Sequence, residues 1–150
     1  RNPDPLRTSY QRDYDRLIFS SAFRRLQNKT QVFPLPGAVF VHNRLTHSLE
    51  VASVGRSMAR IVGGALADKH FAPGTAGEAF YRHELQNVVA AAGLAHDIGN
   101  PPFGHSGEDA IRAYFADECG PAVRALLDEA LTPAQALDFE RFEGNSNALR

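Results

Sequence analysis

Long stretches without a helix-breaking residue constrain this chain more than any other feature. Its 12 Gly and 9 Pro gather at a few places instead of separating evenly spaced short strands. Between those places, apolar residues recur every three to four positions, the period of an α-helix buried along one side. The sequence contains no internal repeat and no low-complexity tract. It therefore predicts an all-α fold.

The predicted helices cover most of the chain. One amphipathic helix is expected over residues 8–28, and a long one over residues 44–68 with Asn43 as its N-cap. We expect the buried stripe of the long helix to be formed by Leu45, Leu49, Ala52, Met58, Ile61, Val62 and Ala65. Further helices are predicted over residues 78–96, 106–118, 121–131 and 133–142. The Pro-containing segment 32–41 allows at most a short hairpin.

Composition limits the class of protein. A length of 150 residues corresponds to about one domain, and 43% hydrophobic with 22% charged residues is ordinary for a soluble protein. No apolar run approaches the roughly 18 residues of a membrane span, and no signal-like segment is found, so a cytoplasmic location is expected. Cys119 is the only cysteine, so any metal must be bound through His and carboxylate ligands.

Charge is distributed unevenly along the chain. Residues 1–60 carry 10 Lys and Arg against 4 Asp and Glu, whereas residues 61–150 carry 6 against 13. One interpretation is an ordinary solvated helical surface. The other is that N-terminal arginines face a polyanion while carboxylates gather near a cation.

His96 and Asp97 form the first candidate for chemistry. They stand where an apolar helix runs out into the sequence IGNPPFG, and a backbone that breaks there lets both side chains reach one cation. The alternative is a buried His that bonds its neighbour. His47 is a candidate third ligand, with Arg44 one turn away to grip a phosphate, although a lone helical His is usually structural. These nitrogen and oxygen donors suit Mn, Fe, Co, Ni, Zn or Mg.

His105 and Glu108 form the second candidate. They lie three residues apart at the start of a predicted helix and therefore share one face. A carboxylate beside an imidazole orients it and raises its basicity, as a general acid or base requires. A helix N-terminus with a favourable Glu in its first turn explains the same spacing equally well.

Four sequence blocks together resemble the HD-domain phosphohydrolases, and more narrowly their deoxyguanosine triphosphate triphosphohydrolase (dGTPase) group. The blocks are SSAFRRLQNKTQVFPLP at 20–36, NRLTHSLEVASVGR at 43–56, LAHDIGNPPFGHSGE at 94–108 and FEGNSNALR at 142–150. They occur in the order of that family. The resemblance implies an HD-domain helical bundle, of which residues 1–150 form an N-terminal part that continues beyond Arg150.

By this resemblance, His47, His96 and Asp97 are metal ligands, joined by an aspartate expected beyond Arg150. His105 and Glu108 are implied to act at the reacting phosphorus. Substrate contacts are implied for Gln31, Arg44, Asn100 and Asn145.

The implied reaction is hydrolysis of a deoxynucleoside triphosphate to deoxynucleoside and tripolyphosphate. The implied cofactor is a divalent metal ion, Mn or Mg first, with Fe, Co, Ni or Zn as alternatives. A homo-oligomer and a nucleotide or single-stranded DNA effector are further expectations. Two other functions stay open: an HD phosphohydrolase of nucleoside monophosphates or cyclic nucleotides, and a non-catalytic nucleotide-sensing domain.

Overall fold

Helices are the only regular secondary structure among the residues that the structure describes. The computed structural model describes residues 6–30 and 42–148, so the segment in which a hairpin was considered lies outside the described residues. The helical elements are α1 (Ser9–Phe19), α2 (Ser21–Arg25), η1 (Leu26–Asn28), α3 (Arg44–His70), α4 (Ala76–Ala79), η2 (Phe80–Glu84), α5 (Leu85–Ala95), α6 (His105–Ala113), η3 (Tyr114–Glu118), α7 (Pro121–Ala130), α8 (Pro133–Glu140) and α9 (Gly144–Ala148). No strand occurs among these residues, which confirms the all-α prediction.

Two helix starts follow directly from local sequence. The Asn43 side chain accepts a hydrogen bond from the Thr46 backbone N–H at 2.9 Å and begins α3 where the sequence predicts it. At α8, Thr132 and Gln135 form a capping box ahead of Pro133, whose fixed φ suits the first helical turn. Both starts were predicted within one residue.

The first predicted helix is wrong in one respect, because it breaks at Ser20. This residue has an extended backbone (φ −70°, ψ 145°), and its hydroxyl accepts from the Phe23 N–H at 3.1 Å to start α2. A serine hydroxyl that satisfies a free backbone donor offers the chain an alternative to a continuous helix. The break turns Phe23 and Leu26 into the core, where both are buried.

The buried face of α3 also differs from the prediction. Small residues are buried there, namely Ser48, Ala52, Ala59, Gly63 and Ala67. Leu49, Met58 and Ile61 are exposed instead. Close approach explains the choice: a Cβ added to Gly93 of α5 would lie 2.9 Å from the Cα of Ala52, so only small side chains fit between the two helices.

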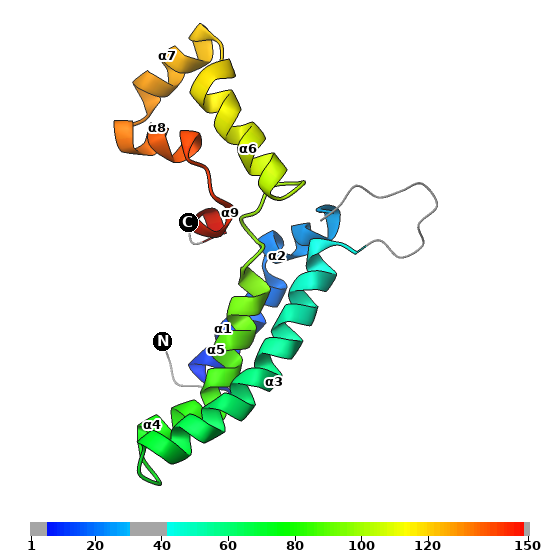
Figure 1. The fold of residues 1–150 in the computed structure, drawn as a ribbon, viewed down its shortest axis with the longest axis vertical. Helices are drawn as coiled ribbons and strands as arrows, with labels where there is room; N and C mark the ends of the chain where they lie inside the picture. Colours follow the sequence, from blue (N-terminus) through cyan, green and yellow to red (C-terminus); the bar gives the residue numbers. More distant parts are fainter. Residues whose placement is uncertain (1–5, 31–41, 149–150) are drawn as a thin grey trace.

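The helices α3 and α5 lie side by side and form the most extensive helix–helix contact among the described residues. Helix α1 packs against α5 (Figure 1). Their core consists of Phe23, Leu26, Ala52, Ala90 and Leu94. After α5, an irregular loop leads to α6, α7 and α8, which extend beyond this bundle, and α9 returns to the loop (Figure 1). Among the described helices, none is both long and apolar enough to cross a membrane.

Candidate metal centre

Three predicted ligands converge where α3 begins and α5 ends. Candidate ligand atoms of His47, His96 and Asp97 all lie within 4.8 Å of one another. The ring centroids of His47 and His96 are 5.2 Å apart, and the rings meet edge to face. His47 lies in the first turns of α3, whereas His96 is the C-cap of α5, so the helix packing brings together residues that are far apart in sequence.

The carboxylate of Asp97 is buried, and its two oxygens have different surroundings. Oδ1 accepts hydrogen bonds from Arg44 Nη1 at 2.8 Å and from Asn100 Nδ2 at 2.6 Å. Oδ2 is buried without a hydrogen-bond donor and stands 3.6 Å from Nε2 of His96. A buried acceptor without a partner costs about 1–3 kcal/mol. A cation between Oδ2 and the imidazoles would remove that cost, so this donor set fits a divalent metal ion.

The second nitrogen of His96 is fixed by the backbone. Its Nδ1 lies 2.7 Å from the carbonyl oxygen of Gly93. Because a carbonyl only accepts, Nδ1 is the donor of this hydrogen bond, so in a neutral imidazole the lone pair is on Nε2. Metal-binding histidines are usually oriented in this way by a hydrogen bond from their other nitrogen.

Lys29 holds the loop that follows Asp97 and was not assigned a role from sequence. Its Nζ donates to the carbonyl oxygens of Ile98 at 3.2 Å and Asn100 at 2.7 Å. Burial, with the nearby positive charge of Arg44, lowers the pKa of Lys29. Its position in the first resemblance block was the only sequence signal for this contact.

His105 and Glu108 are hydrogen-bonded to each other at the start of α6. The His105 Nδ1 lies 2.9 Å from Oε2 of Glu108, whose other oxygen accepts from the Gly144 N–H at 2.9 Å. The carboxylate is buried, whereas the imidazole is 95% exposed. The hydrogen bond raises the pKa of His105 and lowers that of Glu108, and the N–H of Gly144 and the charge of Arg112 lower the latter further.

Two of the three candidate ligands, His47 and Asp97, line one pocket together with His105 and Glu108. Its volume is about 250 Å³, and its walls are Arg44, His47, Asp97, Asn100, Gly104, His105 and Glu108. Gly104 has a backbone conformation (φ 59°, ψ −129°) that side chains disfavour, and a Cβ there would lie 3.0 Å from Arg44 Nη2. The pocket therefore contains candidate metal ligands, His47 and Asp97, and an exposed imidazole, His105, that could transfer protons.

The remaining predicted residues are placed less directly. Asn145 is exposed on α9, where its Nδ2 donates to Glu143 at 2.9 Å, and it is not part of the pocket wall. Gln31 lies outside the described residues. From the FEGN block it is Gly144 that lies close to the pocket residues. A Cβ at Gly144 would overlap Oδ1 of Asn100 and come within 2.9 Å of Oε1 of Glu108.

Comparison with known proteins agrees with the geometry. The family model described as HD domain matches residues 44–132, which begin just before His47 and extend past Glu108. The chain belongs to the HD domain family. The metal-ligand candidates and the His105–Glu108 pair thus all lie inside its HD domain.

Three relatives of this HD domain carry closely related names. A "Deoxyguanosinetriphosphate triphosphohydrolase-like protein" of Synechocystis sp. is 46% identical over 144 residues, covering 96% of this chain and 31% of the relative. One of the same name in Pseudomonas aeruginosa is 49% identical over 144 residues, with 96% and 30% covered. The "Deoxyguanosinetriphosphate triphosphohydrolase" of Klebsiella pneumoniae is 43% identical over 147 residues, with 94% and 28% covered. This chain therefore spans about 30% of the length of these relatives.

Proposed function

We propose that this HD domain belongs to a metal-dependent enzyme that hydrolyses deoxynucleoside triphosphates to deoxynucleosides and tripolyphosphate. The observation that carries the proposal is the buried, donor-free Oδ2 of Asp97, which lies 3.6 Å from Nε2 of His96. Asp97 lines the same pocket as His47, His105 and Glu108. The names of the relatives support the substrate class.

The metal would be bound by His47, His96 and Asp97. When bound, it would neutralise phosphate charge and make water a better nucleophile. We infer Mn or Mg as the native ion from the family resemblance, since the donors alone also accept Fe, Co, Ni or Zn. Asn100 and Arg44 hold Oδ1, which leaves Oδ2 directed at the site.

His105 would move the protons of the reaction. The bond between the α-phosphorus and the 5′ oxygen breaks as a water oxygen bonds to the phosphorus. The 5′ oxygen needs a proton to leave, while the attacking water loses a proton to solvent, and solvent protonates the donor again. Glu108 accepts from Nδ1 and so keeps the imidazole protonated and oriented, which leaves Nε2 to donate that proton. His105, at the start of α6, would thus protonate the leaving 5′ oxygen.

Arg44 would bind phosphate as well as orient Asp97. Its Nη1 is occupied by the carboxylate, but its Nε is buried without an acceptor. A guanidinium has five N–H donors in a fixed fork, so one residue can serve both groups. A phosphate oxygen in the pocket would supply the missing acceptor.

Phosphorus NMR of the products tests the proposal. With dGTP and Mn²⁺ or Mg²⁺, we expect tripolyphosphate as the phosphorus-containing product, and a His105→Gln control should slow its appearance. Orthophosphate or pyrophosphate would contradict the proposed reaction. Hydrolysis of nucleoside monophosphates or cyclic nucleotides would favour another HD phosphohydrolase, and dGTP binding without any product would favour a sensing domain.

A further inference from the structure

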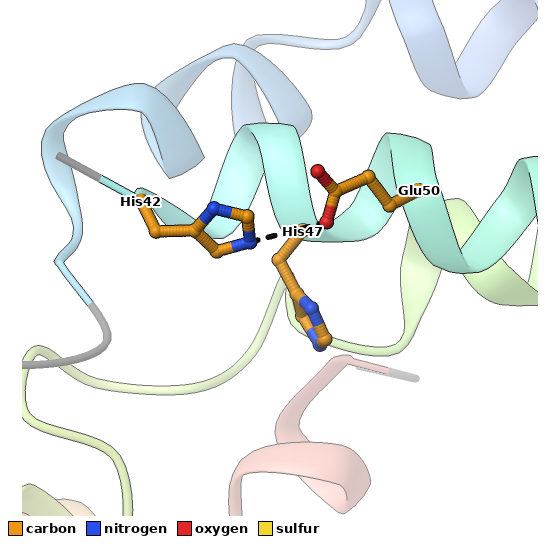
Figure 2. Close-up of side chains that lie close together, drawn as sticks. All are labelled: His42, His47 and Glu50. Atoms are coloured by element: carbon orange, nitrogen blue, oxygen red, sulfur yellow. Dashed lines mark ion pairs between the residues drawn. The ribbon is translucent and has the colours of Figure 1, made fainter. Parts of the chain in front are cut away.

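A second group of side chains that could bind a metal lies at the start of α3. His42, His47 and Glu50 offer ligand atoms that are all within 4.8 Å of one another (Figure 2). Nothing in the proposed reaction uses His42 or Glu50. Both are exposed, whereas Asp97 of the proposed metal centre is buried.

The backbone places these three residues together. His42 directly precedes the N-cap Asn43, which is anchored by an antiparallel bridge to Thr30. From there the imidazole of His42 points along the first turns of α3 and meets the carboxylate of Glu50 (Figure 2). Glu50 follows His47 by three residues and therefore lies on the same face of the helix.

The distances suit a small cation. Nε2 of His42 and Oε2 of Glu50 are 3.1 Å apart. Two ligands that share a tetrahedral Zn²⁺ at about 2.0–2.2 Å are themselves separated by about 3.3 Å. A ring nitrogen of His47 lies within 4.8 Å of the ligand atoms of the other two residues, so small side-chain movements would let all three bind one ion.

We propose that His42, His47 and Glu50 form a second cation site, selective for Zn²⁺ over Mn²⁺ and Mg²⁺. Two imidazoles and one carboxylate, with water completing the coordination, match the ligands of zinc sites that keep an open position. At nitrogen-containing sites Zn²⁺ binds more tightly than Mn²⁺, whereas Mg²⁺ prefers oxygen ligands in an octahedron.

The two sites exclude each other because they share His47. A neutral imidazole has one lone pair, so His47 binds one ion at a time. Zinc at the outer site would therefore remove a ligand from the proposed metal centre and inhibit the enzyme. This consequence rests on the proposed function, whereas zinc binding by the outer site does not.

Zinc titration of a His96→Gln variant tests the site itself, because this change disables the inner centre and keeps His42, His47 and Glu50. Calorimetry should show one Zn²⁺ bound. Adding His42→Gln or Glu50→Gln should weaken it by about a hundredfold, since even outer contacts of a metal site are worth about 10–100-fold. His70→Gln, an exposed change at the far end of α3, should have no effect. No zinc binding, or binding unchanged by His42→Gln, would overturn the proposal.

Displacement of Mn²⁺ from the otherwise unsubstituted protein tests the competition and does not depend on how well the His96 variant folds. Electron paramagnetic resonance should detect free Mn²⁺ as Zn²⁺ is added, and Glu50→Gln should raise the zinc concentration required by tenfold or more. Equal displacement in both proteins would mean that zinc simply enters the inner centre, which contradicts competition from the outer site. Failure of Mn²⁺ to bind at all would count against the proposed metal centre, while the zinc titration would still decide the outer site.

Discussion

The imidazole–carboxylate pairs His96–Asp97 and His105–Glu108 are built from the same chemical groups but differ in their hydrogen bonds. In the His105–Glu108 pair, both carboxylate oxygens accept hydrogen bonds, and one of them binds the imidazole at 2.9 Å. In the His96–Asp97 pair, the imidazole donates to a backbone carbonyl instead, and Oδ2 of Asp97 has no donor. A carboxylate whose two oxygens both accept hydrogen bonds can hold the proton of a neighbouring imidazole in place. A carboxylate with a buried oxygen that lacks a donor favours a cation beside it.

The partners of each carboxylate create this difference. Arg44 and Asn100 both donate to Oδ1 of Asp97, which leaves Oδ2 without a donor and 3.6 Å from Nε2 of His96. Glu108 is held by the Gly144 N–H, so its other oxygen meets His105. Substitutions that separate the two pairs should therefore have different effects on metal binding and on proton transfer.

The largest effect is expected for Asp97→Asn. The amide keeps an oxygen for Arg44 and Asn100 but loses the anionic ligand, so turnover should fall by at least about a thousandfold, or roughly 4 kcal/mol of transition-state stabilisation. Steady-state rates of tripolyphosphate release measure this, and circular dichroism checks the fold. A variant with near-normal turnover would remove Asp97 from the site.

His105→Gln comes next. Loss of a positioned proton donor should lower kcat by about 10²–10⁴-fold while the metal stays bound. Kinetics and metal analysis on the same preparation separate the two effects. Loss of the metal from this variant would instead make His105 a ligand.

Gly144→Ala should cause a smaller loss through position alone. The added Cβ would overlap Oδ1 of Asn100 and crowd Oε1 of Glu108 at 2.9 Å. We expect about 1–3 kcal/mol of lost stability and about a tenfold to hundredfold fall in kcat. Gly120→Ala is the matched control, since a Cβ there meets nothing within 4 Å. Equal thermal unfolding and equal rates in both variants would contradict the role of Gly144.

Glu108→Gln should shift the pH profile. Glu108 raises the pKa of His105, so the variant should lose its protonated imidazole at lower pH and the alkaline limb of kcat should move to lower pH. In the parent protein, the raised pKa of His105 gives stability that is lost as pH rises through it. The lowered pKa of Glu108 gives stability that is lost as pH falls through it. The free energy of unfolding in urea should therefore differ most between the two proteins at pH values between the pKa of Glu108 and that of His105. An alkaline limb of kcat that does not shift in Glu108→Gln would argue against proton transfer by His105.

Local signals predicted the parts of the fold that depend on neighbouring residues. The Asn43 cap and the Thr132 capping box are encoded within four residues of sequence. The convergence of His47 with His96 and Asp97 was expected mainly from the resemblance. From helix spacing alone, each of these residues could also have had a purely structural role, such as a buried His bonded to its neighbour.

Contacts between distant segments could not be read from periodicity. The face of α3 that is buried depends on how closely Gly93 lets α5 approach, so small residues are buried and Met58 and Ile61 are exposed. The hydrogen bonds from Lys29 to the loop after Asp97, and from Gly144 to Glu108, join segments 69 and 36 residues apart. Backbone donors and acceptors of this kind leave no signature in side-chain patterns.

The metal content of two purified variants tests the central claim most directly. Both Asp97→Asn and Glu108→Gln replace a buried carboxylate by an amide of the same shape. We expect elemental analysis after Mn²⁺ loading and desalting to find stoichiometric metal in the unsubstituted protein and in Glu108→Gln, but not in Asp97→Asn. Stoichiometric metal in Asp97→Asn, or its loss from Glu108→Gln, would contradict the assignment of the two pairs.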